Sequence, residues 1–132
     1  MDSSEVEAVF QSYGRVCRDE QFFIDFYDFF MNSSQTIKDQ FLETDMKQQR
    51  HLLRNGIMQL ILYARGMPDT KLQQLGRSHS RNGYAIAPEW YSIWLDALMQ
   101  AVKKHDPEYT PELEAQWRRV LKPGIDLICN AY

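Results

Sequence analysis

The spacing of apolar residues is the feature that most constrains the fold of this chain. They recur every three or four positions along most of its length, which is the period of an α-helix with one face turned to a core. No stretch alternates apolar and polar residues cleanly enough to indicate a strand. We therefore predict an all-α protein in which residues 1–132 form a single domain.

Start and stop signals divide the chain into six to seven helices. Asp45 followed by Gln48 is a capping signature, and Gly66 suits a helix end because glycine tolerates a positive φ. Pro88 and Glu89 are typical of a first helical turn. The predicted helices cover approximately residues 4–17, 19–31, 35–41, 45–65, 68–79, 88–105 and 110–130.

The overall charge and the cysteine content exclude several classes of partner. A net charge of −3 gives no electrostatic reason to expect nucleic acid or an anionic membrane. No run of apolar residues approaches the roughly 18 that span a bilayer. The acidic first residues do not resemble a secretion signal, and Cys17 and Cys129 do not form a disulfide framework. We therefore expect a cytoplasmic protein with reduced thiols.

His79 is the strongest candidate for a metal ligand. It closes a helical stripe with Leu72, Leu75 and Gly76, and an inward imidazole can bind a metal through an uncharged nitrogen. The two other histidines are predicted to lie at the surface and at a helix end, and no two-histidine zinc motif is present. The alternative is a core histidine that only forms hydrogen bonds. One inward histidine without a second protein ligand favours a haem, which brings four nitrogens of its own.

Tyr27 and Gln49 are polar residues inside apolar helical stripes. A buried polar group without a hydrogen-bond partner destabilises the fold, so each of these residues is expected to have a structural or functional role. Taken singly, each could be a partly exposed residue that water satisfies. Taken together, they can supply an O–H and an N–H donor to bound dioxygen.

The ordered set of these residues resembles the globins, in particular bacterial single-domain globins related to flavohaemoglobin and Vitreoscilla-type haem domains. The resemblance extends over nearly the whole chain. It rests on Phe26-Tyr27, Phe41, Thr44-Asp45-Met46 leading to Gln49 and Leu53, Leu75 and His79 with Gly83, Pro88-Glu89-Trp90-Tyr91, and Trp117.

The resemblance implies a globin fold of the three-over-three kind around a haem b. His79 would bind the iron, and Tyr27 and Gln49 would act on the gas ligand, which could be O2, NO or CO. The residues expected to contact the haem are Phe41, Leu53, Ile57, Leu75, His79, Tyr84 and Tyr91. The family places a glutamate near the end of the last helix, where this chain has Tyr132.

Three functions are compatible with this resemblance. The first is oxygen binding, with oxidation of nitric oxide to nitrate by a nitric oxide dioxygenase activity that would need an external reductase. The second is a haem-based gas or redox sensor that acts through a separate partner protein. The third, a haem-free globin-like interaction protein, is disfavoured by His79 and Phe41. The resemblance leaves the oligomeric state open, with a homodimer as one option.

Overall fold

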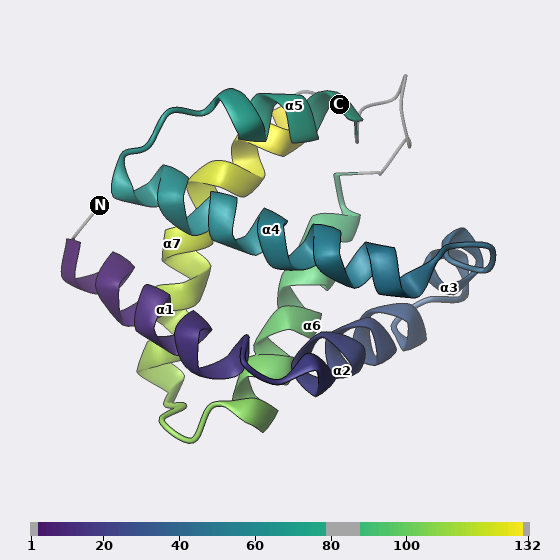
Figure 1. Ribbon diagram of the computed structural model, residues 1–132, viewed down its shortest axis with the longest axis horizontal. Helices are drawn as coiled ribbons and strands as arrows, with labels where there is room; N and C mark the ends of the chain where they lie inside the picture. The colour runs from purple at the N-terminus through teal and green to yellow at the C-terminus, as the bar shows by residue number, and fades with distance from the viewer. Residues whose placement is uncertain (1–2, 79–87, 131–132) are drawn as a thin grey trace.

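The computed structural model describes residues 3–78 and 88–130 (Figure 1). Over these ranges all regular structure is α-helical, which confirms the predicted class. No helix within them combines the length and apolar composition needed to cross a membrane. The helices are α1 (Ser3–Val16), α2 (Glu20–Asn32), α3 (Gln35–Gln40), α4 (Met46–Arg65), α5 (Thr70–Ser78), α6 (Trp90–His105) and α7 (Pro111–Asn130).

The ends of α2 and α4 follow from their capping residues. The Asp19 carboxylate accepts a hydrogen bond from the Gln21 main-chain N–H, and the Asp45 carboxylate accepts one from that of Gln48. Each satisfies a donor that the first helical turn leaves unpaired. Gly66 ends α4 with a φ of 109°, a conformation that favours glycine. The capping and termination signals predicted for α4 are thus confirmed.

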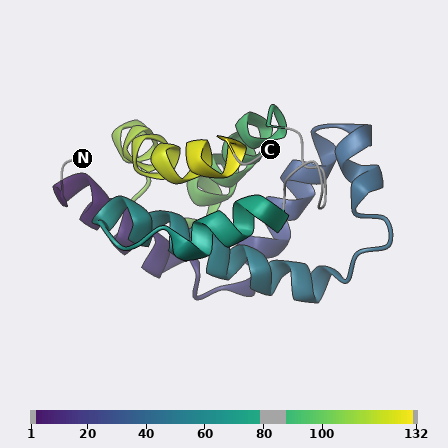
Figure 2. The same cartoon turned by 90° about the horizontal axis from the view of Figure 1, so that it is seen from above.

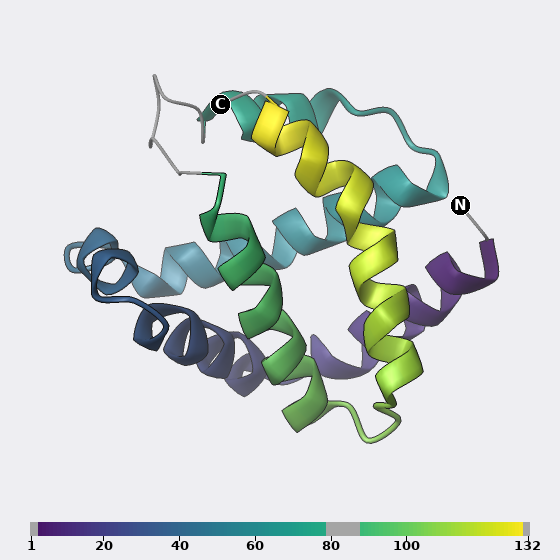
Figure 3. The same cartoon turned by 180° about the vertical axis from the view of Figure 1, so that it is seen from behind.

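The helices form two layers that cross at steep angles. In Figure 1, α1, α4 and α5 lie on the near side, whereas α6 and α7 lie on the near side in Figure 3. Figure 2 shows the same separation from above. Helix α2 packs against α6, and α4 packs across α7. The largest fully buried side chains form the core and include Trp117, Tyr13, Phe22, Phe23, Phe26, Ile57, Ile61 and Leu98.

Gly124 allows α7 to approach α4 and α5 closely. A Cβ atom at this position would lie 2.5 Å from Leu60 Cδ2 and 3.3 Å from Leu72 Cδ1. Both leucines are buried, so they have little room to move away. The small residue therefore lets α7 lie against both α4 and α5.

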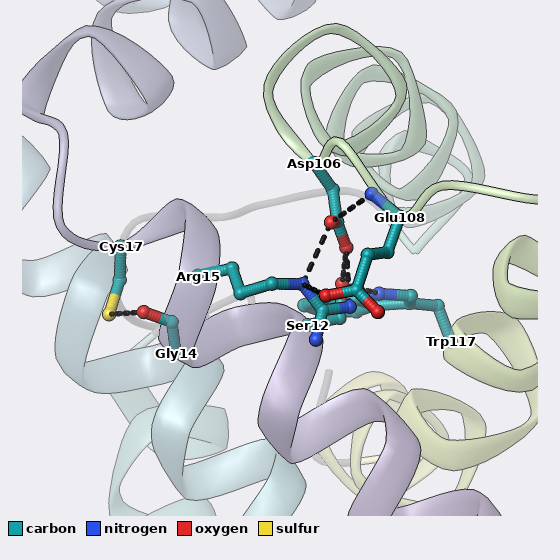
Figure 4. Close-up of polar contacts among 7 residues, drawn as sticks. All are labelled: Ser12, Gly14, Arg15, Cys17, Asp106, Glu108 and Trp117. Carbon is teal, nitrogen blue, oxygen red and sulfur yellow. Dashed lines mark hydrogen bonds and ion pairs between the residues drawn. The ribbon is translucent and has the colours of Figure 1, made fainter.

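A buried polar network centred on Asp106 ties α1 to α7 (Figure 4). The carboxylate accepts hydrogen bonds from Ser12 Oγ at 2.6 Å and from the Arg15 guanidinium at 2.9 and 3.0 Å. The main-chain N–H of Glu108 donates to it at 2.9 Å, and Trp117 Nε1 donates to Ser12 Oγ at 2.9 Å. Burial opposes ionisation of Asp106, but the Arg15, Ser12 and Glu108 donors prevail and lower its pKa.

A second buried carboxylate, Asp25, joins α2 to the end of α6. It accepts hydrogen bonds from Gln21 Nε2 at 2.9 Å and Lys104 Nζ at 3.0 Å, and His105 Nε2 lies 2.7 Å from Asp25 Oδ2. Burial opposes ionisation, but these three side chains together lower the pKa of Asp25 to about 2. His105 is the last residue of α6, the helix-end position that the sequence predicted.

Candidate functional site

Tyr27, Phe41 and Gln49 come together where α2, α4 and the end of α3 meet. The Tyr27 hydroxyl donates to the Gln49 main-chain carbonyl oxygen at 3.4 Å. The Tyr27 and Phe41 rings pack edge to face with their centroids 5.7 Å apart. These residues come from distant parts of the sequence, so only the packing of the helices brings them into one site.

The environment of Tyr27 keeps its hydroxyl protonated. The side chain is buried, and burial raises the pKa of the phenol well above its ordinary value. The Gln49 side chain and the Arg50 guanidinium both favour the ionised form, but they do not overcome the effect of burial. At neutral pH the Tyr27 hydroxyl therefore keeps its proton and can donate a hydrogen bond.

The face of α4 that begins at Gln49 continues as an apolar wall. Leu53 and Ile57 follow at four-residue intervals, and both are buried, whereas Gln49 is half-buried. The polar amide thus stands at the more exposed end of an apolar surface. Leu53 and Ile57 are thus shielded from water, whereas Gln49 keeps partial access to it.

Aromatic rings extend the site from Tyr27 toward α6. Phe26 contacts both Tyr27 and Trp94, with ring centroids 4.9 and 5.7 Å apart. Phe30 contacts Phe41 at 6.1 Å. Flat groups of this kind offer large apolar contact area with defined geometry, which suits a planar ligand. The sequence predicted that these phenylalanines point inward but not which of them touch.

Tyr91, near the start of α6, has a buried hydroxyl with no hydrogen-bond partner among the described residues. Burial raises the pKa of this phenol, and the nearby Cys129 thiol raises it further. Leaving such a group unsatisfied costs about 1–3 kcal/mol. Leu75 and Tyr91 are both half-buried against the common core.

Two residues of the predicted site, His79 and Tyr84, lie outside the described residues, and so does Tyr132, which stands where the family has a glutamate. The iron ligand and the full set of haem contacts therefore stay predictions. Within residues 3–78 and 88–130, no group of three or more His, Cys, Asp or Glu residues could hold a metal ion.

The sequence analysis did not point to Arg50. The positive charge of its guanidinium acts to lower the pKa of Tyr27, against the larger effect of burial. Its Nε lies 2.7 Å from Glu20 Oε1 of α2. The only available signal was its position next to Gln49 in a predicted helix.

The chain is similar to one solved structure over almost its entire length. That crystal structure is of a protein from Pseudomonas aeruginosa PAO1 described as structurally highly homologous to a human haemoglobin. The two sequences are 50% identical, the match covers 97% of this chain and 98% of the other, and the TM-score is 0.94. A scan of family models and a search of curated proteins gave no match. The structural likeness confirms the predicted fold.

Proposed function

The chain belongs to the globin superfamily, and from that premise we propose that it is a haem protein that binds dioxygen. One observation carries the proposal. Within this fold, the Tyr27 hydroxyl and Gln49 converge beside Phe41. The buried phenol donor of α2 thus lies against the polar end of an apolar face of α4, which supports a role for Tyr27 as a donor to a polar gas ligand.

The described residues fit a haem. Phe41, Leu53 and Ile57 offer apolar and aromatic contacts, and Leu75 and Tyr91 lie against the same core. The buried Tyr91 hydroxyl, which has no partner within residues 3–78 and 88–130, would accommodate a polar acceptor near the start of α6. We propose that His79 binds the iron and that Tyr84 adds a further haem contact. Haem b would supply an iron that binds O2, NO or CO.

Tyr27 and Gln49 would set the oxygen affinity. Bound dioxygen would carry partial negative charge, and each hydrogen bond that Tyr27 or Gln49 donated to it would be worth about 1.5–3 kcal/mol. That energy corresponds to a factor of roughly 10 to 150 in affinity for each donor. Two donors predict slow oxygen release and therefore poor reversible transport.

Slow oxygen release favours a chemical use of the bound gas. The proposed reaction is oxidation of nitric oxide to nitrate, in which both oxygen atoms of O2 end in the product. Conversion of NO and O2 to the nitrate anion takes up one electron, which an external reductase would have to supply in each turnover.

The proposal is tested by loading the purified protein with hemin. We expect a Soret band in the wild type, and His79→Ala should alter or abolish it. In the reduced protein, Tyr27→Phe should speed oxygen release by about tenfold or more, with Tyr13→Phe, which also removes a hydrogen bond to α4, as the matched control. A His79→Ala spectrum identical to that of the wild type, or unchanged release from Tyr27→Phe, would contradict the proposed site.

A further inference from the structure

Two buried tyrosines donate to main-chain carbonyl oxygens of α4. Tyr13 of α1 donates to the Arg54 carbonyl at 2.8 Å, and Tyr27 of α2 donates to the Gln49 carbonyl at 3.4 Å. Both therefore tie α4 to the helices that precede it. The two contacts differ in strength, because 3.4 Å is long for a hydrogen bond whereas 2.8 Å is optimal.

The middle of α4 has further contacts with α1 and α2. Arg54 Nη1 donates to the Cys17 carbonyl oxygen at 2.8 Å, and Arg50 Nε pairs with Glu20 at 2.7 Å. The helix is therefore firmly held around residues 50–54. The Tyr27–Gln49 and Arg54–Glu20 hydrogen bonds are the longest of these contacts, at 3.4 Å each, and the Tyr27–Gln49 bond lies nearest the start of the helix.

The Tyr27 hydroxyl carries one proton and can donate it fully to only one acceptor. The Gln49 carbonyl loses little when Tyr27 leaves, because it lies inside α4 and can accept from the N–H four residues ahead. A stronger acceptor near Tyr27 would therefore take over the hydrogen bond that its hydroxyl donates. A gas ligand with partial negative charge is such an acceptor.

We propose that the Tyr27 hydroxyl switches its hydrogen bond from the Gln49 carbonyl to the gas ligand when oxygen binds. The first turns of α4 are thereby released from α2. This inference rests on the proposed function, because it requires Tyr27 to donate to the ligand. It adds a structural consequence of binding. The segment from Met46 to Gln49 loses its hydrogen bond to α2, while the Tyr13–Arg54 contact keeps the middle of the helix fixed.

Amide hydrogen exchange of the haem-loaded, reduced protein tests the inference, under nitrogen and then under oxygen. In the wild type, oxygen should speed amide exchange in the first turns of α4 by roughly two- to fivefold. This is the increase in local opening expected when one weak hydrogen bond is lost. In Tyr27→Phe, exchange there should already be fast and should not respond to oxygen. In the matched control Tyr13→Phe, exchange around Arg54 should be faster in both gases, and the response of the first turns to oxygen should persist.

The outcomes separate this inference from the proposed function. If Tyr27→Phe speeds oxygen release but oxygen leaves wild-type exchange unchanged, the ligand-binding role stands and the release of α4 is wrong. A response to oxygen of equal size in Tyr27→Phe would also overturn the inference. If oxygen release is unchanged in Tyr27→Phe, both are wrong.

Discussion

Replacement of Asp106 by asparagine tests whether the buried network in Figure 4 stabilises the fold. The side chain is fully buried and accepts four hydrogen bonds. An amide keeps the shape but offers one oxygen, so it can serve the two donors on one side only. The two donors on the other side, one of them from Arg15, would then face an N–H2 group.

The expected cost follows from those two lost contacts. A hydrogen bond to a charged group is worth about 1.5–3 kcal/mol, and breaking a buried ion pair costs about 3–5 kcal/mol. Arg15 is partly exposed and can be rehydrated, so we expect the lower end, about 3 kcal/mol. Ser12→Ala should cost about 1–3 kcal/mol, because Trp117 Nε1 loses its acceptor.

Urea unfolding of each variant at neutral pH measures these costs. Asp126→Asn is the matched control, since Asp126 is exposed and pairs with Lys122 at the surface, and it should change stability by less than about 0.5 kcal/mol. The double variant of Ser12 and Asp106 should show coupling, because both residues belong to one network. An Asp106→Asn cost no larger than that of Asp126→Asn would refute the reasoning.

Three further predictions concern other parts of the fold. The pKa of Asp25 falls from 3.8 to about 2 on folding, so its ionised form stabilises the protein above about pH 4. The wild type should therefore lose roughly 2 kcal/mol more than Asp25→Asn between pH 5 and pH 2, as measured by denaturant unfolding. Gly124→Ala should gain about 1 kcal/mol of helix propensity but lose about 1–3 kcal/mol through overlap with Leu60, so a higher melting temperature would contradict the close approach. Asp45→Ala should cost about 1 kcal/mol by removing the α4 cap, and an unchanged unfolding midpoint would show that the cap contributes nothing.

Local signals in the sequence predict part of the fold, whereas the long-range contacts are not visible in it. The start of α4 at Asp45, its end at Gly66 and the burial of Tyr27 were predictable, because each depends on a few neighbouring residues or on helical spacing. The partner of the Tyr27 hydroxyl was not, since Gln49 is 22 residues away and contributes its main chain. A pattern of side chains carries no information about which carbonyl a hydroxyl will reach.

The buried carboxylates show the same division. Asp25 and Asp106 look like ordinary charged residues in the sequence, yet both are buried and hydrogen-bonded to other helices. The partners of Asp106 in α1 are more than 90 positions away, and His105 is 80 positions from Asp25. Such pairs depend on how helices cross, which periodicity does not specify.

The sequence by itself determined that the chain forms amphipathic helices, where several of them begin and end, and which family the chain resembles. Those properties follow from spacing, capping and residue type, which act over one or two turns. Only the tertiary structure decided that the Tyr27 hydroxyl contacts Gln49 beside Phe41. It also decided that α7 approaches α4 and α5 closely at Gly124, and that the carboxylates of Asp25 and Asp106 are buried. Those contacts depend on the angles and distances between packed helices, which all the core side chains set together.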